Sequence, residues 1–426
     1  MNTSLTNKLN IFRQFHQKGF FHLLSANILI QIVAFASQLF VAGILLPDDI
    51  GRIKIIQTYL SVFSIIAGMG FNTSVLKLCS ENSTPETKKR LLESSLLFTI
   101  ISSVSLYFII IILNLFGVFS SDNLIKYLIP IGLFPVISNS VFMVFIAYFQ
   151  AIKDMKLISK LTASNKFISI IGIIMLTYWF GIKGFYLAYN VSFLLMLVVC
   201  FKIYRRSQDI RIFRTRNFSG FSTVWKYAKS SILANLFSEM SAYVDILLIG
   251  FFVKDMHQVG YYSFALTITV IFRLFPGTVQ QMASPYFSSL SQQQEDFSLI
   301  FRKYNRLLYL VVIASLGISL IGVPFCIQWI FNGKYEQSMI YFPFLAIGWS
   351  LRQLVQLQSA AIFGLGKIHY NAYVSLFTLI FSVISIALTL LCWGLKVAAY
   401  ASILNGVTFA LCSAYFYKKA RNEVFN

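Results

Sequence analysis

Four ionisable side chains lie inside long apolar runs in the second half of the chain. Arg273 and Arg352 are cations, and Glu239 and Asp245 are carboxylates. A charge at the centre of a membrane costs roughly 2.5 to 3.5 kcal/mol, so such residues usually face a wet interior and carry function. At 1.5 Å per residue Asp245 lies about 9 Å outward of Glu239, too far to offset an arginine directly. One cation remains in surplus, and the expected ligand is an anion.

A purely structural interpretation of the same residues stays open. Glu239 could neutralise Arg273 or Arg352 in a salt bridge that only holds two helices together. Pro276 and Gly277 follow Arg273 closely, and Pro276 removes the backbone hydrogen bond to the carbonyl of residue 272. We therefore predict a bend near Arg273, with Pro276 and Gly277 as the candidate hinge. A proline kink without a gating role is the alternative.

The first half of the chain has only neutral polar groups at the corresponding depth. Asn27, Gln31 and Gln38 are spaced by four and seven residues, which places them on one helical face. They either hydrogen-bond neighbouring helices or contact a polar ligand. No cation is expected at this depth, because Lys54 is assigned to an outer loop and Lys166 to an inner segment.

Motifs for catalysis or metal binding do not occur. The five cysteines are scattered without a CxxC pair, and the four histidines are dispersed. The sequence has no GxxxxGK[ST], HExxH or GxSxG pattern. We expect no catalytic residue, no metal and no cofactor, and the short outer loops leave little room for an enzyme's acid or base. Transport is the favoured function class.

The composition predicts that helices crossing a membrane position these residues. Of 426 residues, 57% are hydrophobic and 12% are charged, about half the charged fraction of soluble domains. Apolar runs of about 20 residues predict an all-α fold of twelve transmembrane helices. The predicted spans are 21–46, 53–76, 91–117, 125–149, 160–181, 184–203, 226–252, 258–284, 303–331, 338–362, 370–393 and 396–417.

The basic residues predict the orientation of these spans. The inner segments, including Lys77, hold 26 of the 35 Lys and Arg residues, and the outer loops hold seven. This distribution predicts cytoplasmic termini and accounts for most of the positive charge without nucleic acid as a partner. The basic connection at 203–225 is either a solvated loop near anionic headgroups or a specific partner site.

An internal repeat divides the chain at this connection. Three segment pairs match at offsets of 209, 214 and 213 residues, and the first aligns Gly51 with Gly260. We predict an N-terminal six-helix lobe at 1–203, a basic cytoplasmic connection at 204–225 and a C-terminal six-helix lobe at 226–426. An even number of spans per lobe implies a pseudo-two-fold axis along the membrane normal.

Three motifs carry a family resemblance across nearly the whole chain. They read "LLPDDIGRIKIIQTYLSVFSIIAGMGF", "VDILLIGFFVKDMHQVGYYSFA" and "VPFCIQWIFNGKYEQS". Their marker residues are Gly51, Gly70, Asp245, Pro324, Gly333 and Tyr335. The chain resembles the polysaccharide biosynthesis exporters of the multidrug/oligosaccharidyl-lipid/polysaccharide (MOP) superfamily, and most of all the bacterial O-antigen flippases.

This resemblance implies a transporter that moves polyprenyl-pyrophosphate-linked oligosaccharide, such as the undecaprenyl form, across a bacterial inner membrane. Movement runs from the cytoplasmic to the periplasmic leaflet by alternating access, coupled to a proton or sodium gradient. Membrane lipid, the O-antigen polymerase and a chain-length regulator are the implied partners. A capsule or exopolysaccharide exporter, a drug/cation antiporter of the same superfamily and a membrane polymerase or acyltransferase are the alternatives.

The resemblance also suggests roles for the candidate residues. Arg273 and Arg352 would bind the pyrophosphate, because guanidinium groups bind phosphate oxygens in pairs and stay charged. Glu239 or Asp245 would titrate or pair during the cycle. The remaining candidates are Asn27, Gln31 and Gln38 for the sugar, and Lys77 with the basic connection for attracting the headgroup.

Overall fold

The computed structural model describes residues 20–80, 84–152, 154–207, 221–270 and 293–425, with scattered positions between 272 and 290. Regular structure in this part of the chain is helical. The first half contains α2 (Phe20–Ile44), α3 (Pro47–Gly68), α4 (Phe71–Ser80), α5 (Pro85–Leu115), α6 (Asn123–Leu133), α7 (Pro135–Ala151) and α8 (Met155–Ser207). The second half contains α9 (Phe221–Phe252), α10 (Met256–Ile268), α12 (Gln294–Phe331), the short 3-10 helix η2 (Glu336–Ile340), α13 (Phe342–Leu354), α14 (Gln356–Gly364), α15 (His369–Trp393) and α16 (Leu395–Phe425).

These helices confirm the predicted all-α membrane fold. Within the described ranges, eight helical segments are long and apolar enough to cross a membrane. Each of the twelve predicted spans falls on a helix. Several positions in the second half of the span predicted at 258–284, including Arg273, lie outside the described residues.

Three predicted spans each contain two helices separated by one or two residues. They are the spans predicted at 53–76, 125–149 and 338–362. Between α3 and α4, Met69 and Gly70 have φ angles of 44° and 65°, in the left-handed region that stops a helix. Pro135 starts α7 directly after Phe134, and Val355 separates α13 from α14. Hydropathy averaged over about 20 residues is insensitive to a turn of one or two residues.

Two predicted spans form the two arms of α8. The backbone leaves helical geometry at Gly181, with φ 58° and ψ −141°. A Cβ added to Gly172 would lie 3.3 Å from the Cβ of Ala188, so the arms pack against each other on either side of this turn. Gly394, 213 residues further on, separates α15 from α16 with φ 79°. The matching glycine turns agree with the third repeat match.

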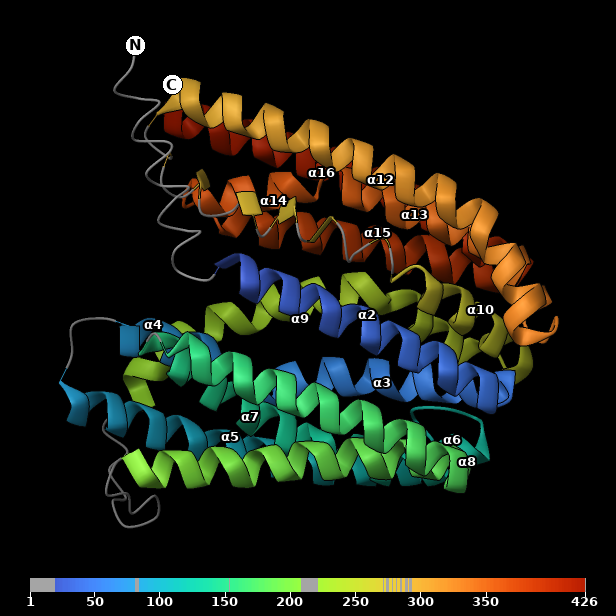
Figure 1. The fold of residues 1–426 in the computed structure, drawn as a ribbon, viewed down its shortest axis with the longest axis horizontal. Coiled ribbons are helices and arrows are strands. Elements are labelled where there is room, and N and C mark those ends of the chain that lie inside the picture. The colour runs from blue at the N-terminus through green and yellow to red at the C-terminus, as the bar shows by residue number, and fades with distance from the viewer. Residues whose placement is uncertain are drawn as a thin grey trace.

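The helices form two lobes around a shared centre. Figure 1 shows α3 to α8 on one side and α12 to α16 on the other, with α2, α9 and α10 between them. One buried apolar cluster joins the two lobes and includes Ile55, Ile129, Tyr262 and Leu345. A second cluster fills the N-terminal lobe and a third fills the C-terminal lobe. The first turns of α9 pack into the N-terminal cluster, where the Ser74 hydroxyl donates to the Val224 carbonyl at 3.0 Å.

Candidate functional site

The two lobes meet where α3 and α10 begin. A Cβ on Gly51 would lie 2.9 Å from the Gly260 nitrogen, and a Cβ on Gly260 would lie 2.0 Å from the Pro47 carbonyl oxygen. Only glycine permits this approach of two backbones. Asp48 and His257 meet beside it, with Oδ1 and Nδ1 2.6 Å apart. Both pairs are 209 residues apart, as in the repeat, so the pseudo-two-fold axis passes between equivalent residues.

A second contact between the lobes lies at the same end of the molecule. The Lys334 ammonium donates to the carbonyls of Ala42 and Gly43, both at 3.2 Å, and to that of Leu45. The Tyr335 hydroxyl donates to the Ala42 carbonyl at 2.9 Å. These carbonyls lie at the C-terminal end of α2, where backbone acceptors lack helical partners and a cation is stabilised. We call Lys334 and Tyr335 the latch, and this end the latch end.

The local sequence explains how the latch is presented. Asn332 and Gly333 end α12 with φ angles of 48° and 76°, which turns the chain back towards α2. Burial lowers the pKa of Lys334 and the nearby charge of Asp49 opposes that shift, so the contact is partly withdrawn from water. The motif residues Gly333 and Tyr335 therefore belong to a contact between lobes.

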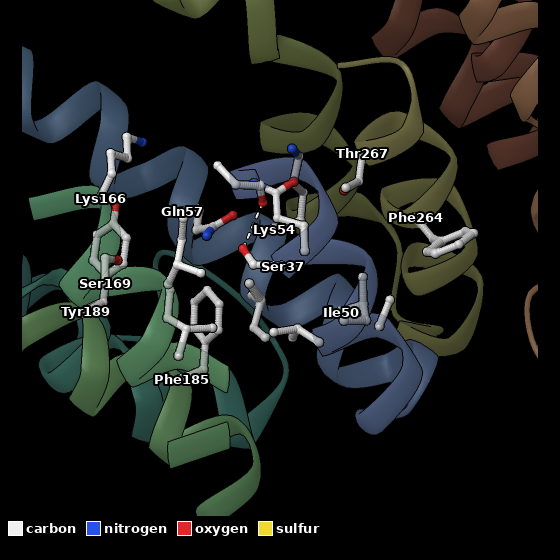
Figure 2. A pocket seen from close by; sticks show the side chains of 17 residues that line it. Ser37, Ile50, Lys54, Gln57, Lys166, Ser169, Phe185, Tyr189, Phe264 and Thr267 are labelled. Atoms are coloured by element: carbon white, nitrogen blue, oxygen red, sulfur yellow. Dashed lines mark hydrogen bonds between the residues drawn. The ribbon is translucent and has the colours of Figure 1, made fainter. Parts of the chain in front are cut away.

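Below the latch, α2, α3, α8 and α10 enclose a cavity of about 130 Å³ between the lobes. It is lined by Ala34, Ser37, Gln38, Val41, Ala42, Ile50, Ile53, Lys54, Gln57, Lys166, Ser169, Ile170, Ile173, Phe185, Tyr189, Phe264 and Thr267. Figure 2 shows Lys54 and Gln57 on α3, Lys166 on α8 and Thr267 on α10. No carboxylate occurs among the described lining residues, so we call it the cationic cavity.

Neither lysine was predicted from the sequence as a site residue. Counting cations by loop assigned Lys54 to an outer loop, but α3 begins at Pro47 and already includes it. Lys166 was assigned to an inner segment, but it lies eleven residues beyond the start of α8 at Met155. Pro47 followed by two aspartates is a helix-start signal that would have identified Lys54 as helical.

A second cavity, of about 270 Å³, lies between α3, α4, α7 and α9. It is lined by Ser61, Ser64, Ile65, Gly68, Gly70, Asn72, Asn139, Ser140, Met143, Asn235 and Glu239. The Asn139 amide donates to the Ser64 hydroxyl at 3.3 Å, and the Ser140 hydroxyl donates to the Ser64 carbonyl at 3.2 Å. We call this the polar cavity, and Glu239 lines it.

A third, water-sized cavity of about 20 Å³ lies inside the C-terminal lobe and contains Asp245. The Tyr262 hydroxyl donates to Asp245 Oδ2 at 2.9 Å. Arg352 lines the same cavity and donates from Nη2 to the Ser241 carbonyl at 2.9 Å and to its hydroxyl at 2.8 Å. Asp245 is attracted electrostatically by both Arg352 and Lys54. We call this the carboxylate cavity.

Asp245 and Arg352 line the same small cavity, although Asp245 was predicted to lie too far along the axis to offset an arginine directly. Ser241, which accepts from Arg352, lies one helical turn before Asp245 on α9. The Arg352 guanidinium also lies 5.4 Å from the Trp349 ring centroid and 5.1 Å from that of Phe409. In this conformation Arg352 holds the C-terminal lobe together and lines neither cavity between the lobes.

The remaining predicted site residues are the proposed sugar contacts and Lys77. Gln38 lines the cationic cavity, whereas Gln31 is an exposed residue of α2 outside the lining of all three cavities. Asn27 lies in α2, but its side chain is outside the described part of the structure. Lys77 is exposed on α4 and lines none of the three cavities. The proposed sugar contacts therefore do not form one described cluster.

The hinge stays a prediction. Pro276 and Gly277 are helical, and Pro276 is buried. Their neighbours, including Arg273, lie outside the described residues.

No group of three or more His, Cys, Asp or Glu side chains able to hold a metal occurs in the ranges that the structure describes.

Comparison with known proteins identifies the family of this chain and solved structures with a similar fold. The family described as "Polysaccharide biosynthesis protein" matches residues 17–291. No curated protein matches the chain significantly in sequence. Among solved structures, the lipid II flippase MurJ in an inward closed conformation has a TM-score of 0.76 at 16% identity, over 95% of this chain and 90% of that chain.

Two further MOP superfamily structures are similar. An inward-facing multidrug resistance MATE family transporter has a TM-score of 0.69 at 13% identity, over 93% of this chain and 94% of its own. A Pyrococcus furiosus transporter with a binding pocket of reverse polarity has a TM-score of 0.65 at 13% identity, over 94% and 93%. These relatives are membrane transporters and not enzymes. The chain belongs to the polysaccharide biosynthesis protein family and has the multi-pass transporter fold of the MOP superfamily.

Proposed function

We propose that this protein is a flippase for polyprenyl-pyrophosphate-linked oligosaccharide, with the O-antigen repeat unit as its substrate. The observation that carries the proposal is the cationic cavity, which lies between the lobes and contains Lys54 and Lys166. A pyrophosphate is a compact anion, and two ammonium groups can donate several charge-assisted hydrogen bonds to it. Gln38 and Gln57 add neutral donors in the same cavity.

The charge of this cavity separates the proposal from a drug/cation antiporter. A lipophilic cation would be repelled by Lys54 and Lys166, and repulsion is strong where water is scarce. Export of capsule or exopolysaccharide units uses the same pyrophosphate chemistry and is the second candidate. The sugars, and not the cationic cavity, would distinguish it from O-antigen transport.

The proposed orientation in the membrane follows from the positive charge of the predicted inner segments. Both termini are placed in the cytoplasm of a bacterium, with the latch end of the molecule at the periplasmic face of the inner membrane. Alternating access then requires the Gly51–Gly260 contact and the latch to open. The O-antigen polymerase and a chain-length regulator are the proposed protein partners. Arg273 stays a proposed ligand of the pyrophosphate.

We propose that a proton or sodium gradient acts through Asp245. The carboxylate attracts Lys54, so it competes with an anion for the charge of that lysine. A proton or Na⁺ bound at Asp245 removes this competition, and the attraction of Lys54 for the pyrophosphate increases. Ion binding inside the C-terminal lobe is thereby linked to anion binding between the lobes.

Binding to the purified protein in detergent tests the proposed substrate class. Lys54→Gln or Lys166→Gln should weaken binding of undecaprenyl pyrophosphate by about tenfold or more, because a hydrogen bond to a charged group contributes about 1.5 to 3 kcal/mol. Lys396→Gln, at an exposed lysine outside the cavity, should have no effect. Tight binding of a lipophilic cation by the wild-type protein, with no binding of undecaprenyl pyrophosphate, would contradict the proposal.

A further inference from the structure

One face of α3 lines both cavities between the lobes. Lys54 and Gln57 face the cationic cavity, and Ser61 and Ser64 face the polar cavity. The spacings of three and four residues place all four on one stripe of the helix. Ser61 lies seven residues beyond Lys54, or about 10 Å along the axis. The two cavities therefore follow one another along a single helix.

The polar cavity has a different chemistry from its neighbour. Its described lining contains serine hydroxyls, asparagine amides and the Glu239 carboxylate, without lysine or arginine. Hydroxyl and amide groups both donate and accept hydrogen bonds, and a carboxylate accepts them. This combination of described residues suits a ligand with many hydroxyl groups.

Both lobes contribute to the polar cavity. Asn72 and Asn139 come from α4 and α7, whereas Asn235 and Glu239 come from α9 and lie one turn apart on it. A ligand there would contact both lobes at once, and its contacts would change when the lobes move. Such a site can read the identity of the cargo during the transport cycle.

We propose that the polar cavity binds the pyrophosphate-proximal sugars of the cargo, with Asn235 and Glu239 as specificity-determining residues. This assignment rests on the proposed function. In the cytoplasmic leaflet the polyprenyl tail lies deepest, the pyrophosphate comes next and the sugars lie nearest the cytoplasm. Along α3, in the proposed orientation, the cationic cavity is deeper and the polar cavity is nearer the cytoplasm. The order of the cavities matches the order of the chemical groups.

The proposal assigns the sugar contacts to residues other than those predicted. Gln38 lies in the cationic cavity, beside the phosphate in this arrangement. Asn139 already donates to Ser64, so its side chain is oriented before a ligand arrives. Asn235 is exposed at the cavity, and its replacement should leave the fold intact.

Two lipid probes test the assignment with the purified full-length protein. The first is undecaprenyl pyrophosphate, and the second is undecaprenyl-pyrophosphate-linked oligosaccharide from cells that make the polysaccharide. Asn235→Ala and Glu239→Gln should each weaken binding of the oligosaccharide-linked probe by about fivefold, as expected for one lost hydrogen bond. Binding of the sugar-free probe should not change. Lys54→Gln should weaken binding of both probes by the same factor.

The binding results distinguish failure of the proposed sugar site from failure of the proposed flippase function. Asn422→Ala, at an exposed asparagine near the end of α16, is the matched control and should change neither affinity. If Asn235→Ala and Glu239→Gln weaken both probes equally, or neither, the sugar site is wrong although the flippase proposal stands. If the wild-type protein binds neither probe, the proposed function itself fails.

Discussion

In the proposed mechanism, Asp245 links ion binding in the C-terminal lobe to anion binding between the lobes. Its carboxylate accepts from the Tyr262 hydroxyl, and it interacts electrostatically with Arg352 in its own lobe and with Lys54 in the cationic cavity. Arg352 is also held by Ser241. A change of charge at Asp245 would act on both cations, and its effect on Lys54 would reach the cationic cavity.

Asp245→Asn tests this link. The amide has no charge and therefore does not compete with the anion for Lys54. Undecaprenyl pyrophosphate should bind to this variant at least as tightly as to the ion-loaded wild-type protein. Transport in proteoliposomes should lose its dependence on an imposed proton or sodium gradient. Glu336→Gln, at the exposed carboxylate that begins η2 directly after the latch, should leave both readouts unchanged. Retained gradient dependence in Asp245→Asn would exclude Asp245 as the coupling group.

At the scale of the element, the break between α3 and α4 shapes the polar cavity. Gly68 and Gly70 both line it, but Gly68 is the last helical residue of α3 and Gly70 has a φ of 65°. Gly70→Ala should lower the free energy of unfolding by about 1 to 2 kcal/mol, because a Cβ strains the left-handed backbone.

The matched variant should have the opposite effect. A Cβ on Gly68 would have no atom within 4 Å, so Gly68→Ala should raise the free energy of unfolding by about 0.4 to 1 kcal/mol. Unfolding in mixed micelles, followed by circular dichroism, compares the two variants. Equal effects of the two substitutions would show that the break does not depend on Gly70.

Hydrophobicity and charge predicted the elements better than the site. Apolar runs located the membrane helices, because burial in lipid requires about 20 apolar residues whatever the tertiary contacts are. Lys54 and Lys166 were missed, because a lysine near a helix end looks like a loop cation until the start of the helix is known. The pairing of Arg352 with Ser241 joins α13 to α9 across the lobe, and this placement depends on tertiary packing that one sequence does not contain.

At the scale of the whole molecule, the repeat places equivalent residues against each other at the latch end. Gly51 meets Gly260, and Asp48 meets His257. A contact on a pseudo-two-fold axis can open symmetrically, with each lobe rotating away from the other. The latch adds hydrogen bonds from the C-terminal lobe to the end of α2, so one conformational change must release both contacts.

Gly260→Ala should shift the molecule towards an open latch end. The added Cβ would lie 2.0 Å from the Pro47 carbonyl oxygen, so α3 and α10 must separate. Overpacking of this kind costs about 1 to 3 kcal/mol, which corresponds to at least about a fivefold gain for the open state.

Ile50, at 8% exposure, lines the cationic cavity near this contact. An Ile50→Cys substitution, in purified protein with the native cysteines replaced, should then react with a maleimide correspondingly faster. Gly317→Ala, where an added Cβ meets no atom within 4 Å, is the control and should leave the rate unchanged. An unchanged rate in a folded Gly260→Ala variant would show that the glycine contact does not hold this end closed.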